Sequence, residues 1–201
     1  MRPPIVFLVL IFLLVGTQDL LAQQKYYYYG ESKTSGGVKF FFGSKSLDDI
    51  WDPVEGHTEI GLKFDFKGRD WPFSIAFDIL SSYDTKANYY YNGYLMDITG
   101  NTLEKNIGIR VETQPSDNIN VFTGAGVSFI NGTFKSSDLF GNSASDADSG
   151  VGSWFEIGAA MKSDNMEFGI NIIESSADIT LFGVSGDAGG LHFGMFFGMR
   201  W

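Results

Sequence analysis

Four residues of this chain have the side-chain types that carry out acyl transfer, namely His57, Ser81, Ser82 and Asp84. A serine becomes a nucleophile when a histidine accepts its proton and a carboxylate orients that histidine. No local motif sets the histidine beside either serine, and the sequence contains no Walker, dinucleotide-binding, zinc or Gly-x-Ser-x-Gly pattern. We therefore expect ordinary structural roles for these residues, assign no catalytic residue and expect a protein without enzymatic activity.

A second candidate group is a run of carboxylates within residues 48–55. Hard cations prefer oxygen ligands, but this run lacks the glycine-pinned spacing of a Ca²⁺ loop. The pattern therefore predicts a solvated acidic loop, and we expect neither a metal ion nor a cofactor. The residues concerned are Asp48, Asp49, Asp52 and Glu55.

The other ionisable residues follow a strand pattern. In residues 57–67, apolar side chains at every second position alternate with Glu59, Gly61, Lys63 and Asp65. A period of two indicates a strand with one apolar and one polar face. The same alternation recurs along the chain and predicts eight strands. They lie near residues 38–43, 57–67, 73–79, 106–111, 119–130, 151–161, 166–172 and 191–201.

The links between these strands alternate between short turns rich in Gly, Pro, Asp and Asn and long polar segments. Short turns on one side and long loops on the other are typical of membrane-spanning barrels. The pattern predicts an all-β fold, an eight-stranded antiparallel up-and-down transmembrane β-barrel. The short links lie near residues 68–72, 114–118 and 163–165, and the long ones near 44–56, 84–102, 131–149 and 175–190.

Alternation by itself does not tell which face points inward. A secreted barrel of the lipocalin type also has eight strands, but it keeps its apolar face inside, around a small ligand. The regular alternation of link lengths, the charges and glycines of the second face, and the terminal Trp201 favour the lipid-facing arrangement. The soluble barrel is the alternative fold.

The N-terminal segment predicts export from the cytoplasm. Arg2, an apolar run over residues 5–15 and a small polar segment after it predict that residues 1–22 are a signal peptide. Residues 23–36 are then an N-terminal lead-in, and residues 37–201 form a single barrel domain. The lead-in contains Tyr26, Tyr27, Tyr28 and Tyr29, whose role the sequence leaves unassigned.

The last strand carries the most specific motif. Its alternating hydrophobic residues end on a terminal aromatic side chain, which resembles the sorting signal of bacterial outer-membrane β-barrels. The resemblance is to the broad family of small barrels that includes OmpX, OmpW, opacity-type adhesins and the OmpA transmembrane domain. It implies a bacterial outer-membrane location, contact with outer-membrane lipid, and the barrel-assembly machinery as a partner during biogenesis. The implied assembly signal consists of Phe193, Met195, Phe197, Met199 and Trp201.

The inward face would hold charges of both signs. Counting from the turns places Lys63, Asp78 and Glu156 near mid-height, with Arg110 and Arg200 nearer the periplasmic end. An eight-stranded barrel is just wide enough for side chains to fill, and buried charges need partners, so a fixed plug is favoured over a gate that re-pairs. Inward glycines leave room for internal water. The predicted lumen network is Lys63, Asp65, Asp78, Arg110, Glu156, Glu167 and Arg200, with Lys39, Glu59, Glu104, Glu112 and His192 also inward.

Composition limits the choice of function. The formal net charge is −10, so nucleic acid is not an expected partner. The family is functionally mixed, and its fold transfers better than its activities. We expect a non-enzymatic barrel whose long loops serve surface interaction, adhesion to an extracellular ligand, or envelope integrity. The alternatives are a narrow porin-like channel for small solutes or ions, and a lipid-modifying outer-membrane enzyme that would depend on His57.

Overall fold

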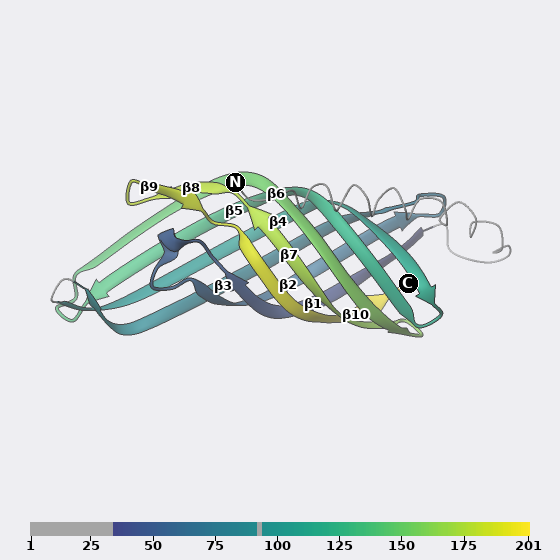
Figure 1. The fold of residues 1–201 in the computed structure, drawn as a ribbon, viewed down its shortest axis with the longest axis horizontal. Helices are drawn as coiled ribbons and strands as arrows, with labels where there is room; N and C mark the ends of the chain where they lie inside the picture. The colour runs from purple at the N-terminus through teal and green to yellow at the C-terminus, as the bar shows by residue number, and fades with distance from the viewer. Residues whose placement is uncertain (1–33, 92–93) are drawn as a thin grey trace.

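The computed structural model describes residues 34–91 and 94–201, which form a closed antiparallel barrel. Each barrel strand pairs with its neighbour in the chain, and the first strand closes the ring against the last (Figure 1). The described ranges contain no helix of sufficient length and apolar character to cross a membrane. The barrel strands are β1 (Thr34–Ser46), β2 (Gly56–Gly68), β3 (Ser74–Tyr91), β4 (Tyr94–Ser116), β5 (Ile119–Asp138), β6 (Ser143–Ser163), β7 (Met166–Ser176) and β10 (Gly190–Arg200).

The barrel is apolar outside and polar inside. Along β7, exposed Phe168 and Ile170 alternate with buried Glu167 and Asn171. Phe64 and Ile109 likewise lie on the outer face, opposite in parity to buried Lys63 and Arg110. A lipocalin-type barrel has the reverse arrangement, so the lipid-facing parity predicted from the sequence is confirmed.

Two predicted loops are instead strands. The segments near residues 84–102 and 131–149 continue the ladders of β3–β4 and β5–β6, which stay paired out to Tyr91–Tyr94 and Ser137–Ser143. Their Thr and Tyr side chains suit strands, but both faces of these segments are largely polar and lack the alternation that marks a half-buried strand. β1 also begins earlier than predicted, at Thr34 within the expected lead-in. The predicted signal peptide and Tyr26–Tyr29 lie outside the described residues.

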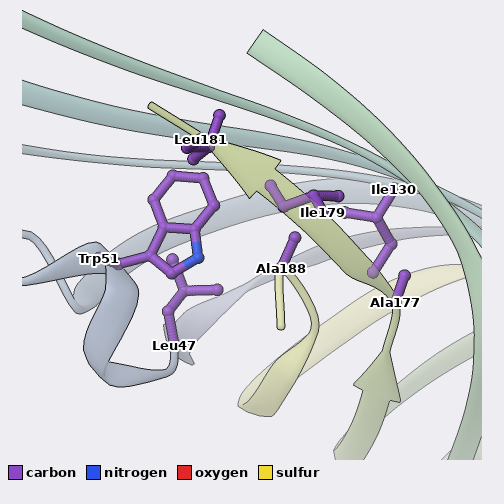
Figure 2. Close-up of a cluster of buried hydrophobic side chains, with 7 residues drawn as sticks. All are labelled: Leu47, Trp51, Ile130, Ala177, Ile179, Leu181 and Ala188. Carbon is purple, nitrogen blue, oxygen red and sulfur yellow. The ribbon is translucent and has the colours of Figure 1, made fainter. Parts of the chain in front are cut away.

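We call the end of the barrel that carries these long hairpins the outer end. Its other two links contain a short 3₁₀ helix, η2 (Asp49–Trp51), and a small hairpin of β8 (Asp178–Leu181) and β9 (Val184–Asp187). Together they bring apolar side chains over the mouth of the barrel (Figure 2). We call this cluster the cap. It consists of Leu47, Trp51, Ile130, Ala177, Ile179, Leu181 and Ala188.

Polar contacts hold the cap in place. Trp51 is fully buried, and its indole Nε1 donates a hydrogen bond to the carbonyl oxygen of Asp187 at 3.1 Å. From the wall, Asp148 accepts from the amide of Thr180 at 2.7 Å, which lowers the pKa of Asp148. Asp146 accepts from the amide of Phe182 at 2.6 Å. The β8–β9 hairpin is therefore tied to β6 rather than free in solvent.

The terminal strand closes the barrel as its pattern predicts. β10 pairs with β1 from Gly37–Arg200 to Ser46–Leu191. Trp201 extends the pairing, because it exchanges two backbone hydrogen bonds of 3.1 Å with Gly36. The alternating residues of this strand face outward, as does Trp201, which is 63% exposed. The five residues of the predicted assembly signal thus lie on the outer face of the barrel, and their recognition by the assembly machinery stays a prediction.

Candidate functional site

The middle of the lumen holds a compact group of four charges, which we call the middle group. The Lys63 ammonium lies 2.7 Å from Glu156 and 3.1 Å from Asp78. The Arg110 guanidinium bonds to Asp78 at 3.2 Å and also contacts Glu156. All four side chains are buried. Two cations therefore meet two carboxylates, which is the condition under which buried charges are tolerated.

Strand register explains this meeting. Lys63 and Asp78 are direct neighbours across β2 and β3. Arg110 stands level with Gly124, which in turn stands level with Glu156. The Arg110 backbone pairs with Ser74, the first residue of β3, near the inner end as expected, and its long side chain reaches outward to Asp78 and Glu156. Barrel strands are staggered by a fixed shear, so counting residues from each turn does not give a common height.

A lower group sits toward the inner end of the lumen. Lys39 lies 3.0 Å from Asp65 and 3.5 Å from Glu167, and all three side chains are buried. Arg200 reaches Glu112 at 2.9 Å and Glu167 at 3.4 Å, and its side chain remains partly exposed. The structure thus brings together the predicted network residues Asp65, Glu167 and Arg200 with two further inward charges.

An upper group lies below the cap. His192 faces Glu59 through Nδ1 at 2.8 Å, and its Nε2 lies 2.9 Å from the Ser175 hydroxyl and 3.3 Å from Glu104. Lys45 bonds to Glu104 at 2.6 Å. Lys45 was not among the predicted inward charges, because the first strand was predicted to end at residue 43, whereas β1 extends to Ser46. The alternation of Lys45 with Lys39 and Phe41 along β1 was a usable signal.

The upper group also contains the residues best placed to hold a metal ion. One ligand atom each of Glu59, Glu104 and His192 lie within 4.8 Å of one another. However, the Lys45 ammonium already neutralises Glu104, and the two ring nitrogens of His192 point toward different carboxylates. A single ion cannot take both ring nitrogens, so the arrangement suits an ion-pair group better than a metal centre.

Apolar side chains fill the lumen between the charges. Phe122 and Phe196 pack edge to face at 5.7 Å, and the Lys39 ammonium lies over both rings at 5.5 and 5.2 Å. Trp154 lies across the glycine-rich side of the barrel, where its indole Nε1 donates to the Ile107 carbonyl at 3.3 Å. The room that inward Gly124 leaves is thus used by Trp154, where we had expected water.

The residues considered for acyl transfer are only partly brought together. His57 Nδ1 lies 2.8 Å from the Ser82 hydroxyl, which also contacts Thr102 at 2.7 Å. Both are buried, and the Trp51 ring packs edge-on against the imidazole of His57. Ser81 faces outward, and Asp84 pairs with Lys86 at 3.3 Å.

The acidic loop of residues 48–55 exposes its carboxylates to solvent. Asp48 also caps η2 by accepting a hydrogen bond from the amide of Asp49. The loop therefore has a structural role at the start of the cap. The four residues are Asp48, Asp49, Asp52 and Glu55.

Several solved structures of small β-barrel proteins align with most of this chain. Ail of Yersinia pestis, solved with the heparin analogue sucrose octasulfate, aligns with a TM-score of 0.57 at 13% identity over 85% of this chain and 100% of its own. OprG of Pseudomonas aeruginosa aligns with a TM-score of 0.57 at 14% identity over 86% and 98%. Neisserial surface protein A aligns at 0.50, with 10% identity over 86% and 100%.

The chain has the fold of the small bacterial outer-membrane β-barrels. Its apolar outer wall is the surface that such a barrel presents to lipid. No family model and no curated protein sequence matches the chain.

The β3–β4 and β5–β6 hairpins extend away from the body of the barrel at the outer end (Figure 1). The outer parts of β4, β5 and β6 line an open pocket of about 470 Å³. At the end of the β5–β6 hairpin, Asp138 accepts hydrogen bonds from both the side chain and the amide of Asn142, which lower the pKa of Asp138. The pocket is lined by Asp97, Thr99, Lys135, Ser136, Ser137, Ser143, Ala144 and Ser145.

Proposed function

We propose that this protein is a non-enzymatic outer-membrane barrel with a closed lumen, which acts through its outer hairpins in surface interaction or envelope integrity. The observation that carries the proposal is the middle group. Lys63, Arg110, Asp78 and Glu156 meet at hydrogen-bond or ion-pair distance across the lumen, and all four are buried. Charges that pair with one another across a narrow barrel fill and close the lumen, and they do not line a water-filled pore.

The cap supports the same proposal independently. Trp51 and Val54 are fully buried over the outer mouth, and the β8–β9 hairpin is tied to the wall through Asp146 and Asp148. An ion path would need the cap to leave as well as the middle group to re-pair. Each change exposes groups that are now satisfied, so both oppose conduction.

A narrow channel is the competing proposal, and conductance separates the two. The refolded barrel is inserted in planar bilayers, beside Trp51→Ala, Glu156→Gln and, as a control, Lys86→Met. A closed barrel gives no steady conductance in the wild type or the control. Steady wild-type conductance that changes in Glu156→Gln would make transport the leading function, because the charge would then line the ion path.

The proposed surface role rests on the hairpins. β4 has 23 residues, whereas a tilted strand crosses the hydrocarbon with about 9–11. Its outer part lies beyond the lipid and offers the exposed side chains of Tyr94 and Leu95. The structure of Ail holds a sulfated, polyanionic sugar analogue. The outer segments here carry many more carboxylates than lysines, so we do not extend that ligand class to this chain.

Replacing the outer parts of both long hairpins with two-residue turns tests this role. The shortened barrel should assemble at wild-type levels and still migrate as a heat-modifiable band, because the lipid-spanning wall is intact. Adherence of expressing cells to a surface, or their resistance to bile-type detergent, should fall. Unchanged adherence and unchanged resistance would refute the hairpin role.

The absence of enzymatic activity is part of the proposal and has its own test. His57 and Ser82 are hydrogen-bonded to each other and buried, and the Trp51 ring packs against His57, which keeps the hydroxyl away from solvent. We expect the lipid A profile of expressing cells to be the same with the wild type, Ser82→Ala and His57→Gln. A change that follows the wild type and disappears in Ser82→Ala would establish the enzymatic alternative.

A further inference from the structure

The outward faces of two neighbouring strands become apolar a second time. From the lipid band outward, β4 reads Leu103, Asn101, Thr99, Asp97 and Leu95 at its outward positions. The adjacent strand β5 repeats the order, with one exposed apolar residue, four polar ones and another exposed apolar residue. Its outward positions are Phe129, Asn131, Thr133, Lys135 and Ser137, and Leu139 follows in the turn directly after the strand. The second apolar zone is thus separated from the protein's own hydrocarbon layer by a polar belt.

This second zone, which we call the tip patch, is strongly exposed. Phe140 is 83% exposed, and Leu139 and Tyr90 are each 69% exposed. Leu95 pairs with Tyr90 across β3 and β4, so both lie on one face. Contiguous exposed apolar groups on a folded protein mark an interaction site. The tip patch consists of Tyr90, Leu95, Leu139 and Phe140, whereas Tyr94, next to Leu95 along β4, faces the opposite side of the hairpin.

The turn that presents the tip patch is held rigid. Asp138 Oδ1 accepts hydrogen bonds from the amides of Phe140 and Asn142, each at 2.9 Å. Its Oδ2 accepts from the Asn142 side-chain amide at 2.7 Å, and Gly141 takes a φ of 86°. Leu139 and Phe140 therefore project from a pre-ordered loop, which reduces the conformational entropy lost when they are buried by a partner.

We propose that the tip patch inserts into a second, zwitterionic lipid surface that faces the cell, such as a phosphatidylcholine bilayer. The patch is a small exposed tip of four side chains, whereas a stable protein interface needs about 800 Å² on each partner. A fluid lipid surface deforms around a small apolar tip, and Tyr side chains suit the boundary between headgroups and hydrocarbon. This inference rests on the proposed surface role of the hairpins and names their partner.

The charges around the tip favour lipid without net charge. Asp84, Asp97 and Asp138 outnumber Lys86 and Lys135 on the outer parts of β3, β4 and β5. An anionic membrane would repel this acidic rim, and no cluster of cations compensates among its described residues. Insertion therefore depends on apolar burial rather than on attraction to anionic headgroups.

Vesicle flotation tests the inference with the whole barrel in nanodiscs and phosphatidylcholine vesicles as the probe. Wild-type barrel should float with the vesicles, and the double variant Leu139→Ser/Phe140→Ser should do so at least tenfold less. Phe182→Asn is the matched control, because Phe182 is an exposed turn phenylalanine on the shorter β8–β9 hairpin and its φ of 51° suits Asn. It should float like the wild type.

A spectroscopic signature adds a direct readout of insertion. Phe140→Trp should keep flotation, and excess tryptophan emission over the wild type should shift to shorter wavelength when phosphatidylcholine vesicles are added. Replacing a third of the lipid with phosphatidylglycerol should weaken flotation, and added salt should restore it. Heat-modifiable migration of every variant establishes that the barrel itself is folded.

Four results would overturn the inference. Equal flotation of Leu139→Ser/Phe140→Ser and the wild type would mean that the tip patch does not bind lipid. Stronger binding to anionic vesicles would indicate a charge-driven contact. Nanodiscs that pair without vesicles, seen as a doubled mass by sedimentation, would assign the patch to a second copy of this chain. Failure of flotation together with loss of cell adherence in the shortened-hairpin barrel would remove the lipid partner but leave the proposed function intact.

Discussion

Arg110 on β4 and Glu156 on β6 meet across Gly124 of the intervening strand β5. A Cβ at Gly124 would lie 2.9 Å from the Glu156 carboxylate and 3.0 Å from the Trp154 ring. The missing side chain at position 124 is therefore what allows two buried charges on next-nearest strands to touch. The middle group depends on a glycine as much as on its charges.

A side chain at position 124 should consequently destabilise the barrel. We expect Gly124→Val to lower the free energy of unfolding by about 1–3 kcal/mol, because the added methyls overpack the contact. Urea unfolding in lipid vesicles measures the loss. Gly56→Ala is the control, since a Cβ there has no neighbour within 4 Å, and it should unfold like the wild type. A neutral Gly124→Val would show that Trp154 and Glu156 can move aside.

Removing one cation from the middle group should be more costly. Lys63→Met leaves Asp78 and Glu156 with Arg110 alone, and an uncompensated buried charge costs about 3–5 kcal/mol. Adding Glu156→Gln to Lys63→Met should recover part of that loss, which the double-mutant cycle in urea measures. Lys86→Met removes an exposed pair and should cost at most about 1 kcal/mol. Equal losses of unfolding free energy for Lys63→Met and Lys86→Met would contradict the proposal that the middle group is a fixed set of buried ion pairs.

A charged residue introduced on the outer wall should destabilise the barrel only where the wall faces hydrocarbon. An arginine near the midplane of a barrel costs about 2–4 kcal/mol, so Phe64→Arg and Ile109→Arg should each destabilise the barrel by that amount in lipid. Thr99→Arg has the same outward parity but lies above the lipid band, and it should be close to neutral. Unfolding by denaturant in vesicles compares the three. A neutral Phe64→Arg would mean that the assigned parity or depth is wrong.

The terminal aromatic residue should matter for biogenesis more than for stability. Trp201 adds only one backbone-paired position to β10, and its ring is largely exposed. If the assembly machinery reads this residue, Trp201→Asp should sharply reduce folded barrel in cells while refolding in detergent proceeds nearly as in the wild type. Quantifying the heat-modifiable band in both settings tests the prediction. Similar losses in the two assays would leave Trp201 with a packing role alone.

The sequence predicts the wall of this protein well. A period of two along β2, β7 and β10 tells which residues face lipid, because one slip in register would move every side chain to the other face. Lys63, Asp78 and Glu156 could accordingly be placed inward from their parity alone. The sequence pattern did not predict the outer hairpins as strands, because strands with two polar faces show no alternation of apolar and polar residues. The outer parts of β3–β6 were therefore predicted as loops.

What each residue touches inside the barrel is a property of the tertiary structure. Parity predicts that Arg110 points inward, but only the shear between strands decides that it reaches Asp78 and Glu156. The position of Trp51 over His57 likewise depends on a link folding back across the mouth. Local pattern thus determined which face each side chain occupies, because alternation is set by the backbone. Closure of the sheet decided which of those side chains meet, because it brings together strands that are distant in the chain.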